Sequence, residues 1–342
     1  MSSLPWLAPL WKRLNAARAA DRLPHALLIA GPRGLGKRQL VEQLVRALLC
    51  TQPDPAGHAC GQCADCRLVA AGSHPDLLRV GPDPDSKSGE IAIDPIRDLA
   101  ERASLTPIRA SRKLVTIDPA DRLNAAAANA LLKTLEEPAG AALLVLVAER
   151  PGRLPATIRS RCQRLRVPVP EESVALAWLA PQLGGDPARA AQRLHLAYGA
   201  PLRALTELDD AALAQRRKLL GSLAALARAE RDPVGEAGAW SGIGARLSLD
   251  CLAGWLCDLL RLQASAAAPR LDDPAVAEML GDLPARLDGA QAHRFLRRVL
   301  EARAAADSTL NPLLTLESLL IEWCQVSQAP VPRGAGGRPE RP

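Results

Sequence analysis

The segment GPRGLGKR, residues 31–38, almost matches the pattern of a phosphate-binding loop. Gly31, Gly36 and Lys37 stand where such a loop carries its glycines and its lysine. The next position normally holds a Ser or Thr, whose hydroxyl binds the magnesium that accompanies the nucleotide, but here it is Arg38. The sequence therefore predicts a degenerate nucleotide site. Such a loop could hold ATP or ADP without hydrolysis, or it could be a glycine turn that only begins a helix.

A second departure from an active ATPase follows the apolar segment KLVTID, residues 113–118. In ATPases that use such a loop, the Asp that ends this strand helps to hold magnesium, and a Glu directly after it polarises the attacking water. Asp118 fills the first position, but Pro119 fills the second and has no group that accepts a proton. Asp121 lies further along and would be a poor substitute.

Four cysteines have the spacing of a metal site. Cys60, Cys63 and Cys66 follow one another at two-residue gaps, and Cys50 lies upstream of them. In a cytosolic protein this spacing indicates a tetrahedral zinc bound by thiolates, although unrelated reduced thiols remain an alternative and His58 could replace Cys50. No catalytic-zinc pattern accompanies the cluster. We therefore expect a structural zinc that stabilises a segment too small to fold alone.

The hydrophobic pattern places these residues in an α/β domain. The apolar run at 26–30 predicts a strand before the glycine loop, and the periodic segment 38–50 predicts a helix after it. The runs at 113–118 and 142–149 predict buried strands of a parallel sheet, and 124–138 predicts a helix that ends at Pro138. Alternating strands and helices favour crossover connections within one sheet.

A chain of 342 residues is too long for one ordinary core. After about residue 168 no strand pattern is left, and the remaining segments have helical periodicity. The Pro-, Gly- and Arg-rich end predicts a disordered tail. The expected domains are an α/β domain at 1–168 with a metal module at about 50–66, a small helical domain at 169–208, a larger helical domain at 209–327 and the tail at 328–342.

Composition excludes several classes of protein. A hydrophobic content of 48% excludes a largely disordered chain, and an aromatic content of 2% favours aliphatic, helix-forming packing. No apolar run is long enough to span a membrane, and the first residues do not form a signal peptide, so we expect a cytoplasmic protein. The net charge of +6 is weak evidence for an anionic partner. A zinc-dependent DNA-binding protein is disfavoured, because only Arg67 adjoins the cysteines and no aromatic residues are interleaved with them.

Short segments spread over residues 4–205 are recognisable as a set: WLAPLWKRL, PHALLIAGPRGLGK, CGQCADCR, GSHPD, NALLKTLEEP, RLPATIRSRC and YGAPLRAL. Together they resemble the delta-prime family of bacterial clamp-loader subunits, which is part of the DNA polymerase III holoenzyme and of the AAA+ superfamily. Beyond residue 205 the resemblance rests on helical content and length. It implies an AAA+ P-loop domain with a zinc-binding insertion, a small helical lid and an all-α collar for oligomerisation.

The resemblance also implies roles for particular residues. Arg161 matches the arginine of the family's Ser-Arg-Cys motif, an arginine finger that acts in trans on a neighbouring subunit's ATP. A guanidinium in that place offsets the charge that develops on the γ-phosphoryl group. Arg203 matches the second sensor arginine of active loaders. The matching zinc ligands are Cys50, Cys60, Cys63 and Cys66, and the degenerate nucleotide site comprises Gly31, Gly36, Lys37, Arg38, Asp118 and Arg203.

The function implied is that of a subunit without ATPase activity of its own. It would be a stator at one end of a heteropentamer that also contains the ATPase subunit and the delta subunit, and it would present Arg161 to the adjacent ATPase. The complex loads the sliding clamp onto primed DNA in replication. The alternative is a catalytically active AAA+ ATPase subunit, the motor of the loader. That alternative requires Lys37, Asp118 and Arg203 to support turnover by themselves.

Overall fold

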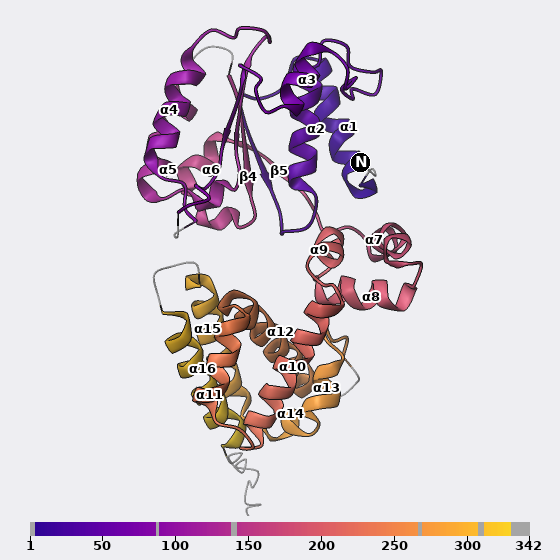
Figure 1. The fold of residues 1–342 in the computed structure, drawn as a ribbon, viewed down its shortest axis with the longest axis vertical. Coiled ribbons are helices and arrows are strands. Elements are labelled where there is room, and N and C mark those ends of the chain that lie inside the picture. Colours follow the sequence, from indigo (N-terminus) through magenta and orange to yellow (C-terminus); the bar gives the residue numbers. More distant parts are fainter. Residues whose placement is uncertain (1–3, 87–88, 138–141, 266–268, 307–310, 330–342) are drawn as a thin grey trace, which may run out of the picture. The chain divides into compact units, whose positions relative to one another are not determined.

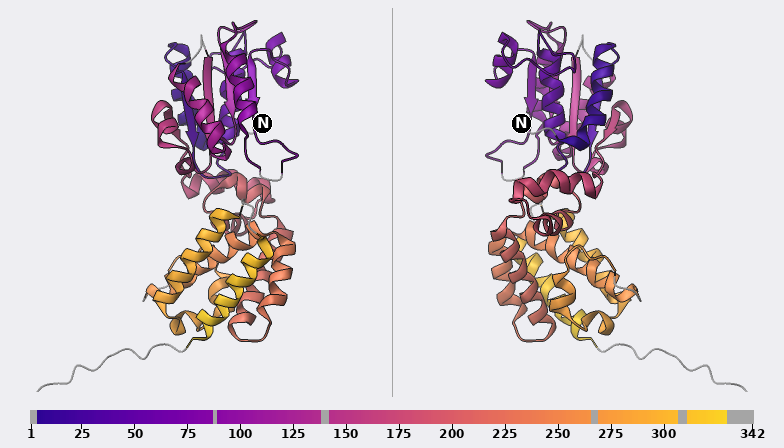
Figure 2. Two further views of the ribbon diagram at one scale, coloured as in Figure 1. Left: turned by 90° about the vertical axis from the view of Figure 1, so that its left-hand side faces the viewer. Right: turned by 90° about the vertical axis from the view of Figure 1, so that its right-hand side faces the viewer.

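The structure is a computed structural model that describes residues 4–86, 89–137, 142–265, 269–306 and 311–329. These residues form two compact units, which divide between Thr206 and Glu207 (Figures 1 and 2). Two expectations lie outside the described residues: the Pro138 at which a helix was predicted to end, and the predicted tail from residue 330 onward.

The first unit is built on a parallel sheet that has five strands among the described residues, in the order β2-β3-β4-β1-β5. The strands are β1 (Ala26–Ala30), β2 (Leu77–Val80), β3 (Lys113–Ile117), β4 (Ala142–Ala148) and β5 (Gln163–Arg166). Every residue of the three central strands is buried, which explains their nearly continuous apolar sequences. The edge strands β2 and β5 contain exposed polar residues and did not show in the hydrophobic pattern.

Helices cover both faces of this sheet (Figure 1). One face packs against α4 (Ile93–Ser104), α5 (Ala125–Glu136) and α6 (Ala156–Arg161), whose apolar residues share one core with the strands. The other face is covered by α2 (Lys37–Leu49), with α1 (Ala8–Ala19) and α3 (Ala64–Ala70) beside it. The short 3₁₀ helices η1 (Pro5–Leu7), η2 (Ala120–Arg122) and η3 (Pro151–Arg153) lie in the connections.

Three short helices complete the first unit: α7 (Glu172–Leu179), α8 (Pro187–Leu196) and α9 (Pro201–Thr206), with the 3₁₀ helix η4 (Ala180–Leu183) after α7. Asp186 caps α8 by accepting hydrogen bonds from the backbone N–H groups of Ala188 and Arg189. The Trp178 ring of α7 packs edge-on against Trp6 of η1, with 5.2 Å between the ring centroids. These helices are thereby fixed beside the start of the chain.

The second unit is helical throughout its described residues. Its helices are α10 (Asp210–Ala227), α11 (Pro233–Ile243), α12 (Ala245–Ala264), α13 (Ala275–Leu280), α14 (Leu283–Arg286), α15 (Gly289–Ala305) and α16 (Pro312–Gln328). Aliphatic side chains make up most of its core, but Trp240, Trp255, Phe295 and Trp323 lie at the centre, fully buried. Half of the chain's eight aromatic residues thus lie where large side chains fill the space between these helices. No helix in the described ranges combines the length and apolar character that a bilayer crossing requires.

Candidate functional site

The glycine loop connects β1 to the first turn of α2, in the strand–loop–helix order that a phosphate loop has. Gly34 and Gly36 have φ angles of +79° and +87°, which a residue with a side chain rarely adopts. A Cβ atom at Gly34 would lie 2.5 Å from Cβ of Arg203, and the Gly34 carbonyl accepts a hydrogen bond of 3.1 Å from the backbone N–H of Leu202. The start of α9 therefore lies directly against the loop.

The other neighbours of the loop come from the start of the chain. Trp6 donates a buried hydrogen bond of 2.9 Å from its indole N–H to the carbonyl oxygen of Leu35. A Cβ atom at Gly36 would lie 2.5 Å from a methyl group of Leu4 and 3.0 Å from one of Leu7. Close packing therefore requires a glycine at Gly34, where α9 backbone atoms are near, and the positive φ favours glycine at both positions.

Lys37, the lysine of the loop, is buried, with 5% of its surface exposed. Its ammonium group donates a hydrogen bond of 2.7 Å to the carbonyl oxygen of Pro32, within the loop itself. Burial lowers the pKa of this amine, and the carboxylates of Glu149, Asp118 and Asp121 oppose that shift. The amine in this structure thus binds the loop backbone.

Arg38 is placed where its side chain meets the end of β3. Its Nε lies 2.7 Å from Oδ2 of Asp118. In an active site of this type, a hydroxyl at position 38 and the carboxylate at position 118 would hold magnesium together. Here a guanidinium already supplies the positive charge beside that carboxylate. The pair lines a cleft of about 530 Å³, whose wall also includes Glu42, Arg79 and Thr116.

Asp121, the weak substitute for the missing catalytic carboxylate, has a different role in the structure. Its two carboxylate oxygens accept hydrogen bonds from the backbone N–H groups of Glu149 (2.9 Å) and Arg150 (3.1 Å). The residue is buried and fixes the turn after β4. Its oxygens are thus occupied by backbone donors, so Asp121 is not placed to act as a general base.

Arg161 is the last residue of α6, and its side chain lies on the surface, 36% exposed. Its Nη2 lies 2.6 Å from Oε1 of Glu136, at the end of α5, and its Nη1 donates to the carbonyl oxygen of Thr157 at 3.1 Å. Arg203 lies in α9 beside Gly34 of the loop, with its guanidinium carbon 5.8 Å from the centroid of the Tyr198 ring. The sequence did not indicate Glu136 as the partner of Arg161, although Glu136 lies in the family-like segment NALLKTLEEP.

The four cysteines converge. Cys50 follows the last residue of α2, and the sulfur atoms of Cys50, Cys60, Cys63 and Cys66 all lie within 4.8 Å of one another. The Cys50–Cys60 and Cys60–Cys66 sulfur separations are 3.5 and 4.0 Å. Sulfur atoms in a tetrahedron around zinc, with Zn–S bonds of about 2.3 Å, would be roughly 3.8 Å apart. The cluster therefore fits a structural metal such as zinc.

Backbone N–H groups point at the same sulfur atoms. Sγ of Cys50 accepts from the N–H groups of Gln52 and Cys60, both at 3.3 Å, and Sγ of Cys63 accepts from that of Cys66 at 3.4 Å. Donation from the Cys66 N–H lowers the pKa of the Cys63 thiol to about 5, whereas burial raises the pKa of the Cys66 thiol to about 12. Because zinc binds thiolates, binding would release the Cys66 proton.

His58 does not join this cluster. Its ring stacks on Trp11, with 5.6 Å between centroids, and its Nδ1 lies 3.2 Å from Asp54. The alternative in which His58 replaces Cys50 is therefore not favoured by the geometry.

Comparisons with known proteins agree over both units. Residues 7–171 match the family model described as "DNA polymerase III, delta subunit", and residues 210–325 match "DNA polymerase III, delta subunit, C terminal". A DNA polymerase III subunit delta-prime of Pseudomonas aeruginosa is 35% identical over 326 residues, which cover 94% of this chain and 97% of the relative. The chain belongs to the delta-prime family of DNA polymerase III subunits.

Other delta-prime proteins are similar over a large part of the chain. That of Escherichia coli is 35% identical over 294 residues, covering 83% of this chain and 84% of its own. A solved structure of a gamma-subunit-related protein from Thermotoga maritima is 21% identical, covering 92% of this chain and 99% of its own, with a TM-score of 0.44. The delta-prime relatives thus confirm the family predicted from the motifs, and the described residues confirm the predicted parallel sheet flanked by helices and followed by a helical region. Delta-prime is a subunit of the clamp loader.

Proposed function

We propose that this delta-prime subunit does not hydrolyse ATP and instead supplies Arg161 in trans to the adjacent ATPase subunit of the clamp loader. The observation that carries the proposal is the ion pair between Arg38 and Asp118. It places a positive charge at the carboxylate that magnesium would need, and Pro119 follows where the catalytic Glu would stand. Both defects concern hydrolysis in the chain's own loop and leave Arg161 intact.

The rest of the loop supports the same proposal. The Lys37 ammonium donates a hydrogen bond to the Pro32 carbonyl, and the start of α9 lies against Gly34. The groups that would bind a nucleotide therefore contact one another. We propose that any ATP or ADP held here is bound without turnover. The subunit would then be a stator of the heteropentamer, held by the collar at about 209–327, and would take part with the ATPase and delta subunits in loading the clamp onto primed DNA in the cytoplasm.

The position of Arg161 suits action on a neighbour. It ends α6, its side chain is partly exposed, and its partner Glu136 is also on the surface. Exposed ion pairs contribute about 0–1 kcal/mol, so a neighbour's γ-phosphate could displace the carboxylate at little cost. In the four-cysteine module, we propose that Cys50, Cys60, Cys63 and Cys66 hold a structural zinc.

The test is an Arg161→Ala variant assembled into the complete clamp loader. Hydrolysis at the adjoining ATPase site should fall at least about a hundredfold, because the charge of the transition state is no longer offset there. The steady-state ATPase rate of the complex falls by that site's share, while size-exclusion chromatography shows unchanged assembly. Arg164→Ala is the matched control, since Arg164 is an exposed arginine of the adjoining strand. An unchanged ATPase rate with Arg161→Ala would remove the finger role.

The rival, an active ATPase subunit, is tested on the purified chain. Magnesium-dependent ATP hydrolysis that is lost in a Lys37→Ala variant would support the rival and reject the stator. We expect no hydrolysis above background, because Arg38 has no hydroxyl that binds magnesium and Pro119 has no carboxylate that activates water.

A further inference from the structure

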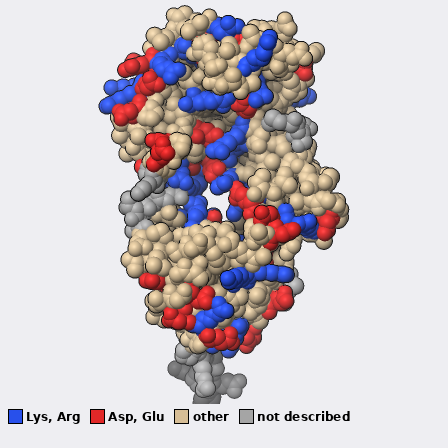
Figure 3. All heavy atoms as spheres, viewed as in Figure 1, with Lys and Arg blue, Asp and Glu red and all other residues tan. Residues whose placement is uncertain are grey.

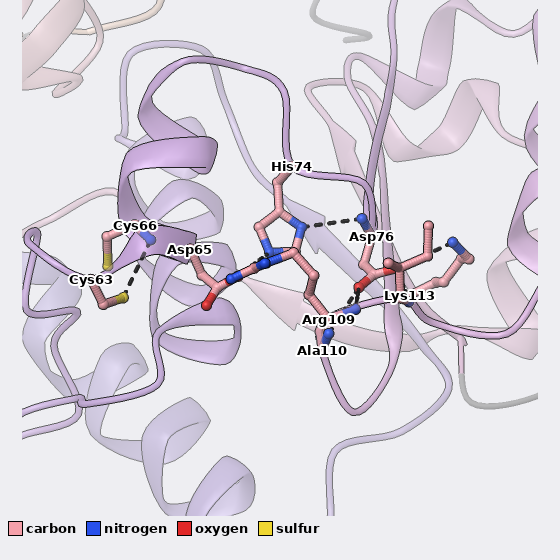
Figure 4. A network of polar contacts seen from close by, with 9 residues as sticks. Cys63, Asp65, Cys66, His74, Asp76, Arg109, Ala110 and Lys113 are labelled. Carbon is pink, nitrogen blue, oxygen red and sulfur yellow. Dashed lines mark hydrogen bonds and ion pairs between the residues drawn. The ribbon is translucent and has the colours of Figure 1, made fainter.

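Helix α3 carries two of the cysteines and also a buried carboxylate. Cys63 caps the helix by accepting from the Cys66 N–H, and Asp65 lies between them in the same first turn. Figure 4 shows Asp65 on the side of α3 that faces His74 and Arg109, with the two cysteine side chains on the other side. Asp65 is therefore placed to fix how α3, and with it two of the sulfur atoms, is turned.

Asp65 makes close contacts with Arg109 and His74, and the Asp65 and His74 side chains are buried. Its Oδ1 accepts a hydrogen bond of 2.6 Å from Nε of Arg109 and lies 3.2 Å from Nε2 of His74, whose side chain is fully buried. Nδ1 of His74 accepts from the backbone N–H of Asp76 at 3.1 Å. An imidazole nitrogen that accepts carries no proton, so the ring proton is on Nε2 and is donated to Asp65.

Arg109 belongs to the connection between α4 and β3, and this connection is fixed by a second carboxylate. The fully buried Asp76 accepts from the backbone N–H groups of Ile108, Arg109 and Ala110 at 2.7–2.8 Å. It also lies 3.2 Å from the ammonium group of Lys113, at the start of β3. His74 contacts the Asp65 carboxylate and the backbone N–H of Asp76, so α3 is joined to residues 105–112 through one continuous polar network (Figure 4).

We propose that Asp65, His74 and Arg109 position α3 for metal binding, and that metal at the four cysteines in turn stabilises the conformation of residues 105–112. The inference rests on the metal site proposed above. A metal needs the Cys63 and Cys66 sulfurs in fixed directions, and the network holds the helix from the opposite side. Because coupling between two sites is reciprocal, whatever the network adds to metal affinity, the metal adds to the order of the loop.

The loop that would be stabilised has an unusual surface. Leu105 and Ile108 are 62% and 73% exposed, although both are large and apolar. The Asp76 carboxylate binds the backbone N–H groups of Ile108, Arg109 and Ala110, so the Ile108 side chain projects from a backbone segment that is held in place. The consequence is that the metal module influences a surface formed by other parts of the sequence.

The first experiment measures zinc affinity of the full-length chain by competition with a chromogenic chelator. Arg109→Ala removes the guanidinium while its backbone N–H can still bind Asp76, and Arg112→Ala is the matched control in the same loop, paired with the exposed Asp21. We expect Arg109→Ala to weaken zinc binding about 10- to 100-fold, the usual effect of losing a partner that orients a ligand, and Arg112→Ala to leave it unchanged. Arg109→Lys should recover part of the loss, since it restores the charge. Equal affinity in wild type and Arg109→Ala overturns the proposal.

A second measurement tests the reverse direction. Amide hydrogen exchange at Ile108, Arg109 and Ala110 should be at least tenfold faster in the zinc-free wild type than in the zinc-bound protein. Amides of β1 and of α12 should change little. Unchanged exchange in the loop, or acceleration spread over β1 and α12, overturns the coupling. Neither measurement depends on Arg161, so the arginine-finger proposal can fail while this one stands.

Discussion

At the scale of single residues, the identity of Arg38 changes the chemistry of the loop in two ways. It removes the hydroxyl that binds magnesium, and it also adds a cation at 2.7 Å from the Asp118 carboxylate. The guanidinium already neutralises the Asp118 carboxylate and would repel a magnesium ion placed beside it. Arg38 therefore supplies a positive charge in place of magnesium, and it also lacks the hydroxyl that would bind the metal.

Arg38→Thr should restore part of the metal site. Without the guanidinium, Asp118 is free to bind magnesium, and we expect magnesium to improve ATP binding by the purified chain about tenfold, or about 1.4 kcal/mol. Hydrolysis should stay at background because Pro119 still provides no base. Binding of a fluorescent ATP analogue with and without magnesium measures the effect, with Lys37→Ala in the same background as the control. Turnover by Arg38→Thr alone would contradict this account.

Glu136→Gln should release Arg161 from its partner in the chain. The pair lies on the surface, so its loss should change the free energy of unfolding by at most about 1 kcal/mol. The freed guanidinium should raise the ATPase rate of the complete loader, by up to about fivefold at the adjoining site. Steady-state ATPase and thermal unfolding report the two effects. A fall in ATPase similar to that of Arg161→Ala would show that Glu136 orients the finger rather than retaining it.

At the scale of elements, burial decides what the sequence reveals. Strands β1, β3 and β4 were predicted because both of their faces are buried and their sequences are nearly all apolar. Strands β2 and β5, with sequences LLRV and QRLR, were missed because an edge strand has a neighbour on one side and tolerates polar residues. Helix α4 was missed too, although the spacing of Ile96, Leu99 and Ala103 is a helical signal.

In the candidate site, contacts between residues close in the sequence were predicted, and contacts between distant residues were not. The cysteines lie within a short stretch of chain, so their spacing alone predicted that they would meet. The Asp65–Arg109 contact joins residues 44 positions apart, and the Asp121–Glu149 contact joins residues 28 apart. Such contacts depend on which strands become neighbours, and local patterns carry no information about that.

Asp76 gives the loop between α4 and β3 a measurable dependence on pH. Burial alone would raise the pKa of its carboxyl, but N–H groups of Ala110, Ile108 and Arg109 and the ammonium of Lys113 outweigh it and lower the pKa to about 2. The folded pKa is thus below the ordinary value of 3.8. Its contribution, roughly 2 kcal/mol, is complete above about pH 4 and is lost as the pH falls toward 2.

Asp76→Asn should therefore destabilise the first unit at neutral pH, and the difference from wild type should shrink between about pH 4 and pH 2. Urea unfolding at several pH values measures it, with excess chelator in all samples so that acid release of metal does not contribute. A difference that stays constant down to pH 2 would contradict the assignment of this carboxylate as the charged partner.

At the scale of the whole molecule, the chain carries two separate cores. Among the described residues, one core packs a face of the sheet against α4, α5 and α6, and another contains the buried indoles of the second unit. On the face shown in Figure 3, basic and acidic side chains are interspersed within each unit, so the net charge of +6 is spread out there. Because the cores are separate, a substitution in the core of one unit can test whether the other unit depends on it. A substitution in the second unit can thus show whether the metal module of the first unit is affected.

Trp323→Ala should unfold the second unit and spare the first. This indole is fully buried, and its N–H donates to the carbonyl oxygen of Leu223 at 3.0 Å, which joins α16 to α10. Loss of such a side chain costs about 3–5 kcal/mol. Calorimetry should show that the unfolding transition of the second unit moves to a lower temperature or disappears. The zinc content per chain should stay as in wild type. Loss of zinc together with the second unit would show that the two cores fold as one.

The Arg38–Asp118 pair has a consequence for how this subunit behaves over time. A bound metal or nucleotide comes and goes with its concentration and with every catalytic turn, but a charge attached to the chain does not dissociate. A positive charge is thus present near the end of β3 at any supply of magnesium or ATP. In the stator role proposed above, this part of the subunit would carry the same positive charge while the sites of its partners fill and empty.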